Sequence, residues 1–186
     1  MSRSPSAALI CGALAIAAAC GGGERASQQE TGTQEGAGTE ESRTRPSTEV
    51  PDTTAAAVWG YLQQADYRNS WRLWPGKGEL YTGREPHGLL LTTYLNDPAY
   101  EALTAAAGTM PANAMIVNEN YMVDSTLAFV AVMFKVAGFD PEHANWFWAK
   151  FEPDGGAQVE GRGQDCIACH GAQTANDYIF TASLTE

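Results

Sequence analysis

The feature that most constrains the fold of this chain is a short motif near its C-terminal end, Cys166-Ile167-Ala168-Cys169-His170. Two thiols three positions apart on one helical turn can add to both vinyl groups on one edge of a porphyrin, and the next histidine can bind the iron. The motif therefore predicts one covalent c-type haem per chain, with thioether bonds from Cys166 and Cys169 and with His170 as an axial ligand of the iron.

Three other interpretations of this motif remain open. A structural zinc site needs further cysteine or histidine ligands, usually a second paired motif, and the other histidines are His87 and His143. A thioredoxin-like redox pair needs a βαβ context near the motif. A disulfide between Cys166 and Cys169 suits an oxidising compartment but would strain the short loop. Haem is favoured because the complete Cys-x-x-Cys-His string is the attachment signature of a c-type haem.

The N-terminus has the pattern of an export signal. Arg3 precedes an apolar run over residues 7–19, which is shorter than the roughly 20 residues of a membrane-spanning helix and suits a signal peptide. The run ends in Ala17-Ala18-Ala19-Cys20, which resembles the lipobox of bacterial lipoproteins, although Ala17 stands where that motif usually has leucine. We predict a signal peptide at residues 1–19 and a lipid-anchored periplasmic protein, lipidated at Cys20. The alternative is ordinary signal cleavage near the same bond.

Residues 20–50 are predicted to be a disordered linker between the lipidated cysteine and a haem domain at residues 51–186. They are rich in Gly, Ser, Thr, Gln and Glu and contain no aromatic residue, so they have too little apolar surface to offset the entropy lost on ordering. The formal net charge of the chain is -11, which argues against a nucleic acid as partner. Cys11 would leave with the signal peptide, so no thiol remains for a structural disulfide.

Apolar spacing and turn residues outline the folded domain. Residues 55–65 have helical spacing with Asp52 or Thr53 as the N-cap, and a second helix begins near Pro98 and ends at Gly108 and Pro111. Residues 69–84 are predicted to form a loop, and strands are predicted at residues 87–95, 114–117, 127–136 and 146–151. The expected fold class is α+β, with a mainly antiparallel β-sheet, a few helices and a C-terminal segment that binds the haem.

Several blocks of sequence from Trp71 onward match one family of haem proteins. The blocks are Glu85-Pro86-His87-Gly88, Met115-Ile116-Val117-Asn118-Glu119-Asn120-Tyr121, Met133-Phe134-Lys135, Gly138-Phe139-Asp140-Pro141, Asn145-Trp146-Phe147-Trp148 and the stretch from Cys166 to Phe180. In these blocks the chain resembles the cytochrome P-460 family, which also includes the cytochrome c-prime beta proteins. The resemblance implies a mainly antiparallel β fold, often a homodimer, with a five-coordinate haem. Known activities of the family divide between oxidising hydroxylamine and binding small gases such as nitric oxide.

One position departs from the pattern of the P-460 enzymes. Those enzymes typically have a Val-Lys-Glu strand block whose lysine is cross-linked to the porphyrin, and Asn118 stands at that position here. An amide cannot form the amine link, and the nearest lysines, Lys135 and Lys150, belong to other segments. We therefore expect a haem without this cross-link and with an open or weakly occupied sixth position. The expected function is binding or transforming small nitrogen species such as nitric oxide, and hydroxylamine oxidation is disfavoured.

The far side of the haem has several candidate residues. His87 could face it or could be a turn residue bonded to its neighbours, His143 is expected to be exposed in a turn, and Glu119, Asp140 and Glu142 are candidate distal acids. The alternative function is a periplasmic electron-transfer cytochrome c with another cytochrome as redox partner. Small carriers of the common type bind a methionine downstream of the motif, and none of the sixteen residues after the motif is methionine.

Replacing Cys20 by serine tests the predicted anchor. The variant lacks the thiol that receives the lipid, so the domain should either enter the soluble periplasmic fraction or remain unprocessed. Cell fractionation and mass spectrometry of the mature N-terminus measure this outcome. An unmodified N-terminus beyond Cys20 in the unaltered protein would contradict lipidation.

Overall fold

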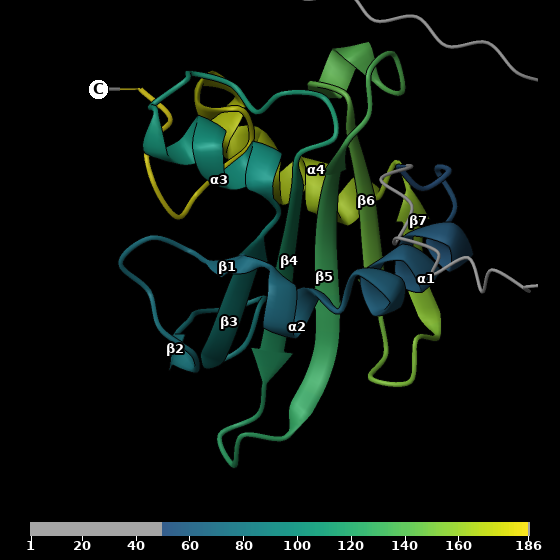
Figure 1. Ribbon diagram of the computed structural model, residues 1–186, viewed down its shortest axis with the longest axis vertical. Helices are drawn as coiled ribbons and strands as arrows, with labels where there is room; N and C mark the ends of the chain where they lie inside the picture. Colours follow the sequence, from purple (N-terminus) through teal and green to yellow (C-terminus); the bar gives the residue numbers. More distant parts are fainter. Residues whose placement is uncertain (1–49, 186) are drawn as a thin grey trace, which may run out of the picture. The chain divides into compact units, whose positions relative to one another are not determined.

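The computed structural model describes residues 50–185, so the predicted signal peptide, Cys20 and nearly all of the predicted linker lie outside the described residues. The described part is built on an antiparallel seven-stranded sheet (Figure 1). Its strands lie in the order β1-β3-β4-β5-β6-β7, and β2 also pairs with β3. The strands are β1 (Arg72–Leu73), β2 (Tyr81–Thr82), β3 (Leu90–Leu95), β4 (Met115–Tyr121), β5 (Leu127–Lys135), β6 (Trp146–Phe151) and β7 (Ala157–Gly161).

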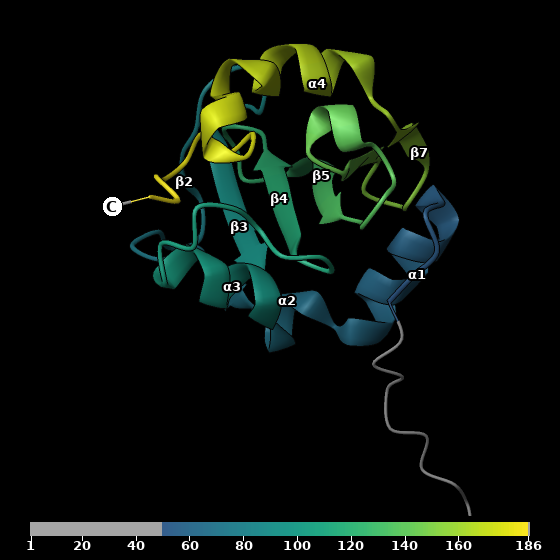
Figure 2. The same ribbon diagram turned by 90° about the horizontal axis from the view of Figure 1, so that it is seen from above.

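Helices lie on both faces of the sheet. Figure 2 shows α1 (Ala55–Ala65) and α2 (Tyr67–Ser70) on one face and α4 (Gln164–His170) on the other. A third helix, α3 (Asp97–Thr104), follows β3, and two 3₁₀ turns, η1 (Pro141–His143) and η2 (Gly171–Asn176), follow β5 and α4. The predicted α+β class with a mainly antiparallel sheet is confirmed. Within residues 50–185, no helix combines the length and the apolar character needed to cross a bilayer.

The first helix occupies the range that its apolar spacing predicts, but its cap differs. The N-cap is Thr54, whose side-chain oxygen accepts a hydrogen bond from the Ala57 N–H at 3.2 Å. The expectation that Asp52 or Thr53 caps the helix was therefore wrong. All three residues have a suitable side-chain oxygen, so composition alone could not choose among these neighbouring positions.

The strands differ more from their predicted ranges than the helices do. β3 begins at Leu90, which leaves His87 in the loop that precedes it, and β4 continues past Val117 to Tyr121. The β6 strand matches its predicted range and is buried on both faces except at Lys150. The sequence does not predict β1, β2 or β7, because these strands are short or polar and form only through pairing with a neighbouring strand.

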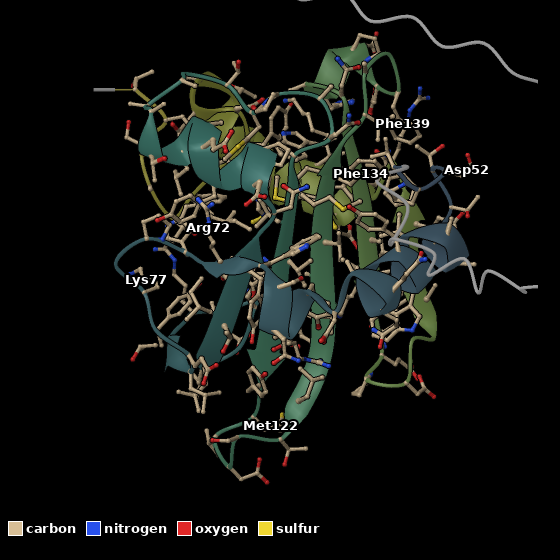
Figure 3. The ribbon with its side chains drawn as sticks, viewed as in Figure 1. Asp52, Arg72, Lys77, Met122, Phe134 and Phe139 are labelled. Atoms are coloured by element: carbon tan, nitrogen blue, oxygen red, sulfur yellow. The ribbon has the colours of Figure 1, made fainter. Side chains whose placement is uncertain are left out.

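Side chains alternate between the two faces of the sheet, and helices cover the two faces to different degrees. We call them the α1 face and the α4 face, after the helix that lies on each. On β5 the residues of the α1 face are buried: Val130, Val132 and Phe134, the last of which is labelled in Figure 3. The alternate residues, on the α4 face, are only partly buried: Phe129, Ala131 and Met133. The α4 face is therefore the one on which the protein leaves apolar side chains incompletely covered.

Candidate functional site

The Cys-x-x-Cys-His motif lies within α4. The helix follows Gly163, where a Cβ atom would lie 2.7 Å from the Cγ1 atom of Val159 and 3.1 Å from the Sγ atom of Cys166. A residue without a side chain therefore lets the start of the helix approach β7 closely. Cys166 is partly buried, Cys169 is exposed, and both are free thiols. The helix thus presents two unpaired sulfur atoms on one turn.

His170, the last residue of α4, is fixed by a hydrogen bond to a backbone carbonyl. Its Nδ1–H donates to the carbonyl oxygen of Tyr178 at 2.7 Å. Because a carbonyl can only accept, Nδ1 carries the proton and Nε2 keeps its lone pair. Burial lowers the pKa of His170 below its usual value, so the imidazole is neutral at pH 7. The side chain therefore has the tautomer and charge of a metal-binding histidine.

The Tyr178 carbonyl reaches His170 because the chain turns back sharply after η2. Asp177 and Tyr178 have φ angles of 52° and 69°. This left-handed conformation costs on the order of 1 kcal/mol for each residue other than glycine. Such a turn persists only where the surrounding contacts hold it, and Asp177 supplies those contacts.

Asp177 is held by groups from three distant parts of the chain. Its carboxylate accepts hydrogen bonds from the Met110 N–H at 2.7 Å and from the Lys135 Nζ atom at 2.5 Å, and its carbonyl accepts one from the Trp146 Nε1–H at 3.0 Å. Asp177 is 4% exposed and Lys135 is 8% exposed. Removing one partner of a buried ion pair leaves an uncompensated charge. The Lys135–Asp177 pair therefore ties the turn that orients His170 to strand β5.

One cross-strand row on the α4 face joins residues of four strands: Thr93, Asn118, Ala131 and Lys150. The last three of these residues are only partly buried. The Nζ atom of Lys150 lies 4.1 Å from the centre of the Phe129 ring on the same face. This part of the α4 face therefore combines a hydroxyl, an amide and a cation with the apolar side chains of Ala131 and Phe129.

Two buried polar atoms on the α4 face lack a hydrogen-bond partner. Among residues 50–185, they are the Oδ1 atom of Asn118 and the Nε1 atom of Trp148, and no other buried side-chain nitrogen or oxygen is unpaired. The Trp148 ring centre lies 4.9 Å from the His170 ring centre. Unpaired buried polar atoms are rare in folded proteins and call for an explanation such as a bound group. Both atoms belong to the face on which His170 lies.

His87 reaches the same region from the loop between β2 and β3. Its ring centre lies 6.0 Å from that of His170 and 6.5 Å from that of Phe129. Its Nδ1 atom lies 3.2 Å from the Oδ1 atom of Asn120, and burial lowers its pKa below the usual value. His87 therefore bonds to the side chain of Asn120 and lies beside the motif histidine, and the expectation that it faces the far side of the haem stays a prediction.

Comparison with known proteins assigns the chain to a family. The family model described as Cytochrome P-460 matches residues 64–181, a range that contains all seven strands and α4. The chain belongs to the cytochrome P-460 family. No curated protein matches the chain significantly. Membership of the cytochrome P-460 family implies that this is a haem protein, and the resemblance found in the sequence is confirmed.

The residues present fit a cytochrome P-460 haem. Cys166, Cys169 and His170 of α4 and Asn118 of the sheet lie on the same side of the sheet, next to apolar side chains that the helices leave partly uncovered. Phe180, whose ring centre lies 5.3 Å from that of His170, adds a further apolar side chain. Two cations, Arg84 beside Phe180 and Lys150 beside Phe129, suit the carboxylates of a haem. Covalent attachment through the two cysteines stays a prediction.

Glu119 lies on the α1 face, opposite the face of α4, so it is removed from the three candidate distal acids. It is fully buried and accepts hydrogen bonds from the hydroxyl groups of Tyr67 at 2.6 Å and Tyr121 at 2.5 Å and from Arg68. Burial, together with the bond to Glu119, raises the pKa of Tyr67. Alternation along β4 puts Glu119 on the opposite face from Asn118. Its carboxylate therefore anchors α2 to the sheet.

The other two candidate acids lie in the turn between β5 and β6. Asp140 is buried and accepts a hydrogen bond from the Nδ1 atom of His143 at 2.9 Å, and Arg162 lies 3.5 Å from the same carboxylate. His143 is therefore partly buried, whereas the sequence predicted an exposed residue. Glu142 is exposed beside it. The contacts of Asp140 thus stabilise the turn.

Replacing Asp177 by asparagine tests the anchor of the turn. The variant leaves the Lys135 ammonium buried without its carboxylate, so the free energy of unfolding should fall by about 3–5 kcal/mol. Urea unfolding at neutral pH measures this change. Asp52→Asn is the matched control, because Asp52 is exposed (Figure 3) and its replacement should change stability by less than about 0.5 kcal/mol.

A second substitution separates the ion pair from other effects of the asparagine. Lys135→Met in the Asp177→Asn background removes the unpaired charge, so it should recover part of the lost stability. Equal stabilities of the unaltered protein and Asp177→Asn would contradict the role given to the pair.

Proposed function

We propose that this protein is an exported c-type haem protein that binds or transforms small nitrogen species such as nitric oxide. The observation that carries the proposal is the arrangement of α4, where two free thiols precede a histidine whose Nδ1–H bonds to the Tyr178 carbonyl. This bond leaves the Nε2 atom of His170 available to a metal. Membership of the cytochrome P-460 family supports a haem as the group that supplies this metal.

The motif residues and the α4 face have separate roles in this proposal. Cys166 and Cys169 would hold one haem per chain by thioether bonds, and His170 would bind it through Nε2. The haem supplies an iron that binds small diatomic ligands. The β5 side chains of the α4 face, Phe129, Ala131 and Met133, are apolar and offer no donor to stabilise bound dioxygen, whereas nitric oxide needs little such help. This composition favours nitric oxide as the ligand class.

Asn118 supports ligand binding over hydroxylamine oxidation. It replaces the lysine that the P-460 enzymes link to the porphyrin, and its Nδ2 atom donates to the Thr93 hydroxyl at 3.1 Å. An amide nitrogen lacks the nucleophilic lone pair of an amine, so Asn118 cannot form the link. Lys150 lies in the same cross-strand row, with Ala131 of β5 between them. We propose that Lys150 forms no link, because its Nζ atom lies over the Phe129 ring.

A periplasmic electron carrier is the second candidate function. The observation that favours it is the 6.0 Å separation of the His87 and His170 rings, since a haem with two protein ligands suits electron transfer. A redox partner such as another cytochrome would then be required. Export, lipid anchoring through Cys20, membrane attachment in the periplasm and homodimer formation belong to the same proposal and rest on the sequence and the family resemblance.

Titration with nitric oxide and an assay with hydroxylamine test the proposed function together. The reduced protein should bind nitric oxide, seen as a change in its haem absorption spectrum, and should oxidise hydroxylamine slowly. Asn118→Lys is the informative variant, because it restores the amine of the P-460 enzymes at a position on the α4 face. We expect hydroxylamine oxidation to rise in this variant.

Thr126→Lys is the matched control for this experiment. It adds the same charge at an exposed residue of the hairpin between β4 and β5, so neither nitric oxide binding nor hydroxylamine oxidation should change. Brisk hydroxylamine oxidation by the unaltered protein, or no binding of nitric oxide by the reduced protein, would contradict the proposed function.

A further inference from the structure

Lys150 is a partly buried cation without an acidic partner. It lies on the α4 face, where its Nζ atom is 4.1 Å from the centre of the Phe129 ring. Five ion pairs occur within residues 50–185, and none of them includes Lys150. A charge that is partly removed from water and has no partner is costly. An anion that binds to this part of the protein would therefore be stabilised by Lys150.

The other cations of the described chain are either paired or solvated. Lys135, the other lysine that is not exposed, forms an ion pair with Asp177. Lys77 and Arg84 have no acidic partner within residues 50–185, but both are exposed, so water solvates their charges. The three remaining cations are arginines in ion pairs. Lys150 is therefore the one cation in the described part of the chain that is neither paired nor exposed.

Lys150 also lies close to residues of the candidate haem site. The Phe129 ring beside it is 6.5 Å from the ring of His87, measured between ring centres. Burial lowers the pKa of His87, and the Lys150 charge lowers it further. Burial raises the pKa of Cys166, and the Lys150 charge opposes that rise. Because such effects weaken with distance, Lys150 is near the first cysteine of the motif as well as near His87.

Two kinds of anion could approach Lys150: a carboxylate of the haem itself or a small anion from solution. Both suit the lysine by charge, but a porphyrin carries its two carboxylate side chains on the edge opposite its two vinyl groups. The thioether bonds predicted for Cys166 and Cys169 would hold the vinyl edge next to α4. Since the Lys150 charge acts on Cys166, the carboxylate edge would lie away from the lysine. This chemistry favours a small anion from solution.

We propose that Lys150 binds nitrite beside the haem, so that a nitrogen oxyanion is a ligand of this protein in addition to nitric oxide. The inference rests on the haem attachment of the proposed function and extends its ligand class from a neutral gas to an anion. Nitrite is small, and its two oxygen atoms accept charge-assisted hydrogen bonds from an ammonium group. The formal net charge of -11 disfavours anions near the protein as a whole. A nitrite site therefore needs a local cation, and Lys150 supplies it.

Calorimetric titration of the oxidised holoprotein with sodium nitrite tests this assignment. Lys150→Met removes the charge and keeps an unbranched apolar side chain, so the Kd for nitrite should rise about tenfold or more. Lys150→Arg keeps the charge and should bind nitrite nearly as well as the unaltered protein. Nitric oxide is neutral, so the reduced forms of all these proteins should bind it equally.

Lys77→Met is the matched control. The Nζ atom of Lys77 also lies over an aromatic ring, 5.3 Å from the ring centre of Tyr81, but Lys77 is exposed. Its replacement changes the net charge by the same amount as Lys150→Met, and the affinity for nitrite should stay as it is. If Lys150→Met folds poorly, Lys150→Gln makes the same test, because it also removes the charge.

Four results would overturn the assignment. The first is no binding of nitrite by the unaltered protein, and the second is an unchanged affinity in Lys150→Met. The third is an equal loss of affinity in Lys77→Met, which would show an effect of net charge alone. The fourth is a changed reduction potential in Lys150→Met without any change in nitrite affinity, because the lysine would then pair with a haem carboxylate.

Two measurements on the same samples separate this inference from the proposed function. Haem that stays with the chain through denaturation, together with nitric oxide binding by the reduced protein, upholds the proposed function whatever the nitrite affinities are. If these hold and nitrite affinity does not depend on Lys150, the inference fails alone. If haem is lost on denaturation, the proposed attachment fails, and the inference fails with it.

Discussion

The hydrogen bond from the His170 imidazole to the Tyr178 carbonyl is the interaction on which the site depends. It sets the tautomer of the histidine and therefore decides that Nε2 is the atom available to a metal. The carbonyl is in place because Asp177 and Tyr178 adopt a left-handed turn, and the buried pair between Asp177 and Lys135 ties that turn to the sheet. The orientation of His170, the last residue of α4, thus depends on an ion pair with Lys135 of strand β5.

The two faces of the sheet differ in how completely the protein covers their side chains. The α1 face is complete as it stands, because α1 and α2 cover its apolar side chains and the fully buried Glu119 is bonded to three partners. The α4 face keeps partly uncovered apolar residues and both of the unpaired buried polar atoms found in residues 50–185. A flat apolar cofactor with two carboxylates would cover these apolar residues, and a carboxylate could accept a hydrogen bond from a donor such as the Trp148 Nε1–H. We therefore propose that a haem would complete the core on this face.

Local patterns were enough to predict the motif, the α1 helix and the buried β6 strand, because each depends on spacing within one segment. The face on which Glu119 lies could also have been predicted, since a residue next to Asn118 in a strand must point the other way. The role of the Tyr178 carbonyl could not be predicted from the sequence, because every residue has a carbonyl group and only the folded chain determines which one bonds to His170. The contact between His87 and Asn120 depends on the register of β3 against β4, so neither residue's own segment predicts it. Strand β7 forms only by pairing with β6, so its own sequence does not predict a strand either.

Mass spectrometry of the haem peptide tests the central claim most directly. After proteolysis of the denatured protein, we predict one fragment containing Cys166, Cys169 and His170 that has the added mass of one haem, joined by two thioether bonds and by no other link. A fragment without haem, a disulfide between the two cysteines, or a further covalent link at Lys150 or any other residue would contradict the account.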